Sequence, residues 1–322
     1  MNDSNQQAQP CPPVYITKWP AESATLDLRG LTAHTLSWGP SHAPLVVMVH
    51  GWMDIAASFQ FVVDELLDLT GGAYRIVSMD WRGFGLTDWP VGSGSPGVRS
   101  YWFADYLADL DALLDTLSPE QPVHLVGHSM GGNLALMYSG IRPDRIRSVV
   151  NLEGFGMNDA EPDKAPGRYA KWLDELKTPH RLKPYADLAA VAKRLQTTNF
   201  RLPNDKAAYL AQHWARKDED GFRLLGDPAH KIMNPIGYRL AEAQAIWRAI
   251  KAPVLHVEAA QTEAGLWLSK PGQPVDFDEF RTRFHCIANW RFQMVEQAGH
   301  MLHHDQPAQV ASLIAGHLAA AA

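Results

Sequence analysis

Residues 127–131, with the sequence GHSMG, constrain the fold more than any other part of the chain, because they match G-x-S-x-G between a strand pattern and a helix pattern. The apolar run 123–126 precedes the motif, and the helical pattern 133–141 follows it. Small residues on both sides of a serine permit a strained strand-to-helix turn, and the start of the helix directs backbone N–H groups toward the hydroxyl. The motif therefore predicts Ser129 as a candidate nucleophile at the carboxyl end of a buried strand.

Apolar runs typical of strands alternate with helical patterns along most of the chain. This alternation predicts an α/β fold with a mostly parallel sheet that is covered by helices. The expected strands are 45–49, 75–79, 123–126, 148–152, 253–257 and 292–295. The expected helices of the same layers are 58–69, 101–117, 133–141, 276–284 and 307–318.

The alternation breaks between about residues 155 and 250, where the helical patterns 166–177, 184–196 and 203–216 are opened by prolines. We expect a core domain of residues 1–154 and 251–322, interrupted by a helical cap of residues 155–250. A chain of 322 residues is long enough for one large domain with such an insertion. Three tryptophans of this segment either line a substrate pocket or pack the helical layer: Trp172, Trp214 and Trp247.

Composition narrows the class of protein. Hydrophobic residues make up 46% and charged residues 20% of the chain, as in soluble globular proteins, and a net charge of −6 argues against nucleic-acid binding. Cys11 and Cys286 lie too far apart in sequence to indicate a disulfide framework or a cysteine-rich metal site. Residues 1–7 are polar, without the features of a signal peptide, and no apolar run reaches membrane-spanning length. We expect a cytoplasmic protein that binds neither nucleic acid nor membrane.

Four separated segments carry a resemblance to a known family. They are HGW at 50–52, DWRGFG at 80–85, GHSMG at 127–131 and Gly299-His300, each placed after an expected strand. In this order the chain resembles the α/β-hydrolase superfamily, and residues 50–59 are similar to the H-G-W-x-D-x-x-x-S-F stretch of its serine-hydrolase-like subgroup. The resemblance implies an eight-stranded, mostly parallel sheet with helices on both faces, an inserted cap and no cofactor.

A serine hydroxyl needs a base to become a nucleophile at neutral pH. His300 follows the last expected strand, and its place after the serine and the acid fits the superfamily's order of triad residues. His303 and His304 lie on the same loop, but their position at the entry to the helix near residue 307 predicts capping or surface contact. For His128 we expect a packing role. We therefore predict His300 as the base.

The triad acid departs from the commonest pattern. Superfamily members usually carry an aspartate after the strand 253–257, whereas here residues 258–263 read EAAQTE. Glu153 ends the preceding strand, at a position that resembles the acid of some haloalkane dehalogenases. A carboxylate there can reach the histidine from the carboxyl edge of the sheet and stabilise the imidazolium. We predict Glu153 as the acid, with Glu258 and Glu263 as alternatives.

Two backbone amides are expected to hold a developing oxyanion: that of Met130, which follows the serine, and that of Trp52, which follows the His-Gly turn. The candidate substrate-binding side chains are Trp52, Trp172 and Trp214. These residues predict a serine hydrolase that cleaves a small or medium carboxylic ester, or a related small acyl substrate, through an acyl-serine intermediate.

Other functions stay open on the same residues. A thioesterase, an aminopeptidase or a C–C hydrolase could use the same triad, and a noncatalytic ligand-binding protein could share the fold. The resemblance disfavours a haloalkane dehalogenase or an epoxide hydrolase, because both families use an aspartate where this chain has Ser129.

Overall fold

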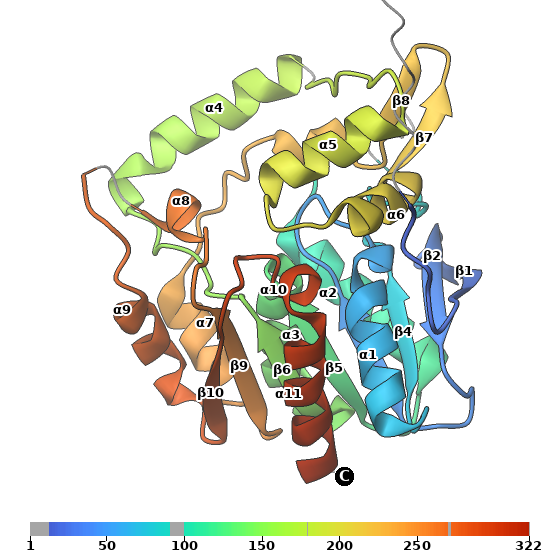
Figure 1. Ribbon diagram of the computed structural model, residues 1–322. Coiled ribbons are helices and arrows are strands. Elements are labelled where there is room, and N and C mark those ends of the chain that lie inside the picture. Colours follow the sequence, from blue (N-terminus) through green and yellow to red (C-terminus); the bar gives the residue numbers. More distant parts are fainter. Residues whose placement is uncertain (1–12, 91–99, 179, 270–271, 322) are drawn as a thin grey trace, which may run out of the picture.

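The computed structural model describes residues 13–90, 100–178, 180–269 and 272–321. Its central feature is an eight-stranded sheet with the order β1-β2-β4-β3-β5-β6-β9-β10. From β4 to β10 the neighbouring strands run parallel, whereas β1 and β2 add antiparallel pairs at one edge (Figure 1). The strands are β1 (Glu22–Leu28), β2 (Leu31–Trp38), β3 (Leu45–Val49), β4 (Arg75–Met79), β5 (Val123–His128), β6 (Ile146–Leu152), β9 (Val254–Ala259) and β10 (Trp290–Val295).

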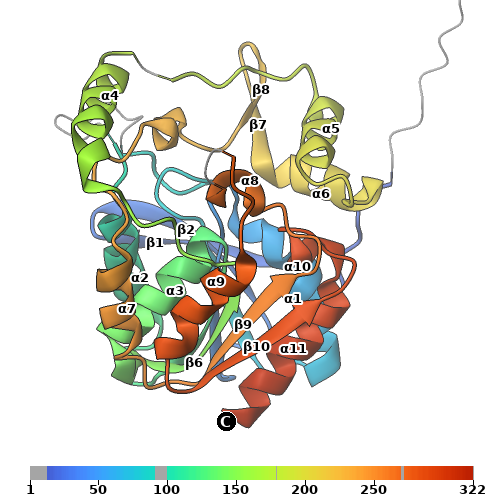
Figure 2. The same cartoon turned by 90° about the vertical axis from the view of Figure 1, so that its left-hand side faces the viewer.

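Helices cover both faces of this sheet, as the alternation of the sequence predicts (Figures 1 and 2). Successive residues of β3 point to opposite faces: Val46 and Met48 join one core cluster, and Val47 and Val49 join the other. The first cluster includes α1 and α11, and the second includes α2, α3 and α7. The helices are α1 (Gln60–Thr70), α2 (Phe103–Leu117), α3 (Met130–Ile141), α7 (Leu240–Trp247) and α11 (Pro307–Ala320).

Most of the segment between β6 and β9 lies over the carboxyl ends of the parallel strands, whereas its last helix, α7, packs against a face of the sheet beside α2 and α3 (Figure 2). It contains α4 (Ala165–Lys177), α5 (Leu188–Thr198), α6 (Asn204–Trp214) and α7, and also a hairpin of β7 (Ala215–Asp218) and β8 (Gly221–Leu224) that the sequence patterns did not indicate. Trp247 of α7 is buried in the core against Phe284, at 5.0 Å between ring centroids. Of the two roles expected for this tryptophan, the structure therefore shows packing.

Among the described helices, none combines the length and the apolar character needed to cross a membrane. Cys286 is a free cysteine. Cys11 and the polar residues 1–7 lie outside the described residues.

Two buried histidines link the stability of the fold to pH. His124 of β5 hydrogen-bonds the Ser148 hydroxyl at 2.7 Å, and His50 accepts a hydrogen bond from the Trp81 amide at 3.0 Å. Burial lowers the pKa of each imidazole from 6.5 to about 4. The unfolded chain binds these two protons at a pH where the folded chain does not, so stability is lost as the pH falls from 6.5 toward 4.

We expect the free energy of unfolding to drop by about 2 kcal/mol for each of these histidines between about pH 7 and about pH 5. Urea denaturation at the two pH values measures the drop. In a His124→Gln variant one contribution disappears, so the drop should shrink by about 2 kcal/mol. An unchanged pH dependence in this variant would contradict the assignment.

Candidate active site

Ser129 occupies a one-residue turn between a strand and a helix. β5 ends at His128 and α3 begins at Met130, and Ser129 has φ 54° and ψ −115°. A non-glycine residue in this region is strained by roughly 1–3 kcal/mol, which the surrounding structure must impose. A Cβ atom on Gly127 would overlap the Gly131 carbonyl, so a larger residue could not form this turn. The turn presents the hydroxyl at the carboxyl edge of the sheet.

Three side chains from separate elements form a hydrogen-bonded chain at this edge. His300 Nε2 lies 3.0 Å from Ser129 Oγ, and His300 Nδ1 lies 3.0 Å from Glu153 Oε2. In its ionised form the Glu153 carboxylate accepts only, and it then fixes the proton on Nδ1 and leaves the Nε2 lone pair facing the hydroxyl. This geometry allows proton transfer from Ser129 to His300.

The Glu153 carboxylate is buried and held by further donors. Glu153 directly follows β6 with φ 59°, and only 2% of its surface is exposed. Oε1 accepts a hydrogen bond from the Ala259 amide at 2.6 Å, and Oε2 accepts one from the Thr262 hydroxyl. Burial raises the pKa of Glu153, and the bonds from Thr262 and Ala259 oppose that rise. These contacts aim Oε2 at His300.

The two alternative carboxylates have other partners. Glu258 Oε1 lies 2.9 Å from His256 Nε2. Glu263 Oε2 accepts a hydrogen bond from the backbone amide of His300 at 2.7 Å, and Oε1 bonds the Arg201 guanidinium. Neither glutamate bonds the His300 ring in the described part of the chain. Glu263 therefore holds the backbone of this loop, whereas Glu153 contacts the imidazole.

The loop that carries His300 is anchored at several points. The Gly299 amide donates to Asp305 Oδ2 at 2.8 Å, and His128 Nε2 bonds the His300 carbonyl at 2.8 Å. Burial lowers the pKa of His300 to about 4, and the charge of Glu263 opposes this shift. The imidazole is consequently a free base at neutral pH, the form that can accept a proton.

The expectation of capping or surface contact for His303 and His304 is wrong. Both lie in α10 (Leu302–Asp305) and are buried, with exposed fractions of 0% and 2%. His304 Nε2 lies 2.6 Å from the Ser58 hydroxyl, and the His303 ring lies 4.3 Å from that of His128. The four-residue helix α10 packs against α1, and so short an element leaves no periodic pattern that could predict its buried face.

The loop after β3 runs directly beside Ser129. A Cβ atom on Gly51 would lie 3.2 Å from Ser129 Cβ, and the next residue, Trp52, has a half-exposed side chain. Met53 has φ 55°, a third strained non-glycine residue at this site. On the other side, Met130 opens α3, where first-turn amides have no acceptor within the helix. These two segments flank Ser129, and their backbone amides remain the predicted oxyanion donors.

Sequence reasoning missed Trp267, which contacts the candidate base. It lies in α8 (Gly265–Leu268), its ring centroid is 4.7 Å from that of His300 in an edge arrangement, and 44% of its surface is exposed. Its position just after the β9 loop, at the same edge of the sheet as Ser129, could have predicted that it lies near the candidate site. Trp172 instead contacts Trp102, at 6.3 Å between ring centroids, and Trp214 is partly buried against two core clusters.

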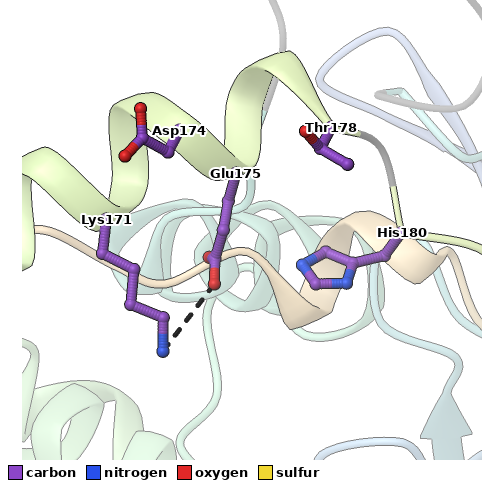
Figure 3. Close-up of a pocket in the computed structure, with 5 residues that line it drawn as sticks. All are labelled: Lys171, Asp174, Glu175, Thr178 and His180. Atoms are coloured by element: carbon purple, nitrogen blue, oxygen red, sulfur yellow. Dashed lines mark ion pairs between the residues drawn. The ribbon is translucent and has the colours of Figure 1, made fainter.

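A hollow of about 500 Å³ lies beside the C-terminal half of α4 (Figure 3). Lys171 and Glu175 extend from the helix toward each other, with 3.8 Å between Lys171 Nζ and Glu175 Oε1. Glu175 Oε2 also accepts a hydrogen bond from the Met233 amide. The other lining residues are Asp174, Thr178 and His180. None of the residues that form the hydrogen-bonded chain lines this hollow, so it is separate from the candidate active site.

The model of the alpha/beta hydrolase fold family matches residues 44–307. The chain belongs to this family. It is 28% identical over 290 residues to the serine hydrolase-like protein of Danio rerio, covering 86% of this chain and 82% of that protein. A shorter match, 37% identical over 131 residues, covers 41% of this chain and 38% of epoxide hydrolase 2 of Siraitia grosvenorii. Among solved structures, the thioesterase domain from the curacin biosynthetic pathway is similar, with a TM-score of 0.78, 26% identity and coverage of 92% of this chain and 99% of that one.

Proposed function

We propose that this protein is a serine hydrolase that cleaves a small or medium carboxylic ester, or a related acyl substrate, through an acyl-serine intermediate. The observation that carries the proposal is the continuous chain from Ser129 Oγ through His300 to Glu153, with 3.0 Å at both steps. The three strained backbone positions at Met53, Ser129 and Glu153 support it, because strain of this kind gathers at functional sites.

In the proposed reaction, Ser129 Oγ attacks the substrate carbonyl carbon while His300 Nε2 takes the hydroxyl proton. The Glu153 carboxylate stabilises the imidazolium that results, and His300 then gives the proton to the leaving alcohol. The backbone amides of Trp52 and Met130 hold the negatively charged oxygen, at a contribution of roughly 3 kcal/mol per donor. Water, deprotonated by His300, releases the acid in the second half of the cycle.

The nucleophile's chemistry argues for acyl transfer over epoxide opening. A carboxylate that opens an epoxide forms an ester, which water can cleave in a second step. A serine hydroxyl would form an ether, which this triad could not hydrolyse, so turnover would stop after one event. The likeness to epoxide hydrolase 2 therefore concerns a shared fold segment more than a shared reaction. The likeness to a thioesterase domain supports thioesters as a second acyl class.

We place the acyl group of the substrate near exposed aromatic side chains around Ser129. Trp52 follows Gly51, where an added Cβ atom would lie 3.2 Å from Ser129 Cβ, and the Trp267 ring contacts the ring of His300. Trp172 and Trp214 come from the segment above the strand ends and would bound the pocket farther out. A large apolar surface with few polar groups suits an acyl chain.

Labelling with a fluorophosphonate probe tests the proposal directly. We expect one covalent adduct, located on Ser129 by peptide mass spectrometry, because the probe reacts with a serine only when a base activates it. Heat-denatured protein is the control and should not react. Absence of label on folded protein would instead favour a noncatalytic protein, and label on another residue would move the nucleophile.

A further inference from the structure

Three buried side chains from distant parts of the sequence meet behind the nucleophile: Asp54, His128 and His303. One nitrogen or oxygen atom of each lies within 4.8 Å of the corresponding atoms of the other two. The exposed fractions are 4%, 1% and 0%, so bulk water does not solvate the cluster. Asp54 belongs to the loop after β3, His128 ends β5, and His303 lies in α10.

Each member of the cluster has a polar atom without a partner among the described residues: Asp54 Oδ2, His128 Nδ1 and His303 Nδ1. The other carboxylate oxygen of Asp54 accepts a hydrogen bond from the Ile55 amide at 2.9 Å, and the nearby Ser58 hydroxyl and Trp214 indole oppose the rise in the Asp54 pKa that burial causes. Buried polar atoms are nearly always bonded, and an isolated exception calls for a cause. Three such atoms in one cluster are open to a shared partner.

The hydrogen bonds of His128 define what that partner must be. Its Nε2–H donates to the His300 carbonyl at 2.8 Å, so Nδ1 carries a lone pair and can only accept. Metal-binding histidines typically show this arrangement, with one ring nitrogen on a carbonyl or carboxylate and the other on the ion. On His303, Nε2 lies 3.5 Å from the Ser58 hydroxyl, which is closer to His304 Nε2, at 2.6 Å.

We propose that Asp54, His128 and His303 bind a divalent transition-metal ion of the zinc type. Two imidazole nitrogens and one carboxylate oxygen are a donor set for such ions, whereas Mg²⁺ and Ca²⁺ prefer oxygen ligands alone. The ion would neutralise the buried Asp54 carboxylate and bind one donor atom of each of the three side chains. It would also link the loop after β3, the end of β5 and helix α10. The first two are already close, since a Cβ atom on Gly51 would lie 3.1 Å from His128 Nδ1.

The site is independent of the proposed hydrolase reaction, since the proposed triad uses none of the three ligands. Its occupation is therefore measured by binding and spectroscopy. The chelator-treated full-length protein is titrated with Co²⁺, which gives visible absorption bands when nitrogen ligands bind it with low coordination number. We expect one Co²⁺ per chain, displaced by Zn²⁺, and a thermal midpoint raised by about 5 °C at a Zn²⁺ concentration about a hundredfold above Kd.

Variants distinguish this cluster from other histidines. Asp54→Asn and His303→Gln should each weaken Co²⁺ binding by at least about tenfold and reduce the absorption bands. His124→Gln, which changes a buried histidine bonded to Ser148, is the matched control and should bind as the parent does. His300→Ala should also bind Co²⁺ as the parent does, because His300 is not one of the three proposed ligands.

Three results would overturn the proposal: no stoichiometric Co²⁺ or Zn²⁺ binding, unchanged binding in both ligand variants, or loss of binding in His300→Ala. Should the ligand variants fail to fold, X-ray absorption of the Zn²⁺-loaded parent decides the question. Scattering from two imidazoles supports the site, and a shell of oxygen atoms alone would reject it.

Discussion

Replacing Ser129 by alanine should lower kcat for an activated ester by at least about 10⁴-fold, because the acyl intermediate loses the only atom that carries it. The thermal midpoint should stay within about 2 °C of the parent, since the hydroxyl contributes no core packing and alanine occupies the same backbone conformation. Hydrolysis of a p-nitrophenyl ester series, measured together with thermal denaturation, provides both readings.

Ser139→Ala is the matched control for this experiment. Ser139 lies in the same helix, α3, is fully buried and donates to the Ala135 carbonyl at 2.6 Å, remote from the triad. Its variant should keep activity within about threefold of the parent, because no catalytic contact changes. Equal activity in Ser129→Ala and the parent would remove Ser129 from the mechanism.

The sequence predicted the central layers of the fold because the spacing of apolar residues in a long strand or helix shows which side chains are buried. The strands β3 and β4 begin and end at the expected residues, and α2, α4 and α11 differ from their expected ranges by at most two residues at each end. The antiparallel pair β1 and β2 was missed, since its exposed edge position gives few apolar residues in β1. The hairpin β7 and β8 was missed because it is short and mostly exposed or half-buried.

The candidate site was predictable where a motif imposes geometry. The GHSMG turn placed Ser129 between strand and helix, and strand order placed Glu153 and His300 at the same sheet edge. The partners of Glu258 and Glu263 were not predictable, because three-dimensional pairing with His256 or the His300 amide leaves no local pattern. The buried positions of His303 and His304 likewise depend on how α10 packs, which a four-residue helix does not encode.

The segment above the sheet is connected to the loop that carries His300 by charged and polar contacts. Arg201, between α5 and α6, bonds Glu263 at 2.7 Å, and Glu263 in turn accepts from the His300 amide. Asn199 of the same connection donates to Asp305, which holds the Gly299 amide. The backbone amides of Gly299 and His300 are therefore both linked to a segment that the sequence assigns to the cap, so the position of this segment affects the proposed base.

Glu153→Gln should lower kcat by several hundredfold or more, on the scale of the roughly 10⁴-fold loss when a triad aspartate is neutralised in a serine protease. The hydrogen bonds explain why the loss should exceed that of a charge alone. The Ala259 amide donates to Oε1, so the glutamine carbonyl must take that position and its NH₂ group must face His300 Nδ1. The imidazole would then carry its proton on Nε2, where it cannot accept the proton of Ser129.

Glu258→Gln and Glu263→Gln are the matched controls, measured with the same ester. Each glutamine keeps an acceptor oxygen, so the Glu263 variant can still hold the His300 amide, and we expect both to stay within about tenfold of the parent. Proton NMR of the imidazole separates the tautomers, since His300 should donate from Nδ1 in the parent and from Nε2 in Glu153→Gln. Loss of several hundredfold in either control, with Glu153→Gln near the parent, would transfer the acid role to the β9 loop.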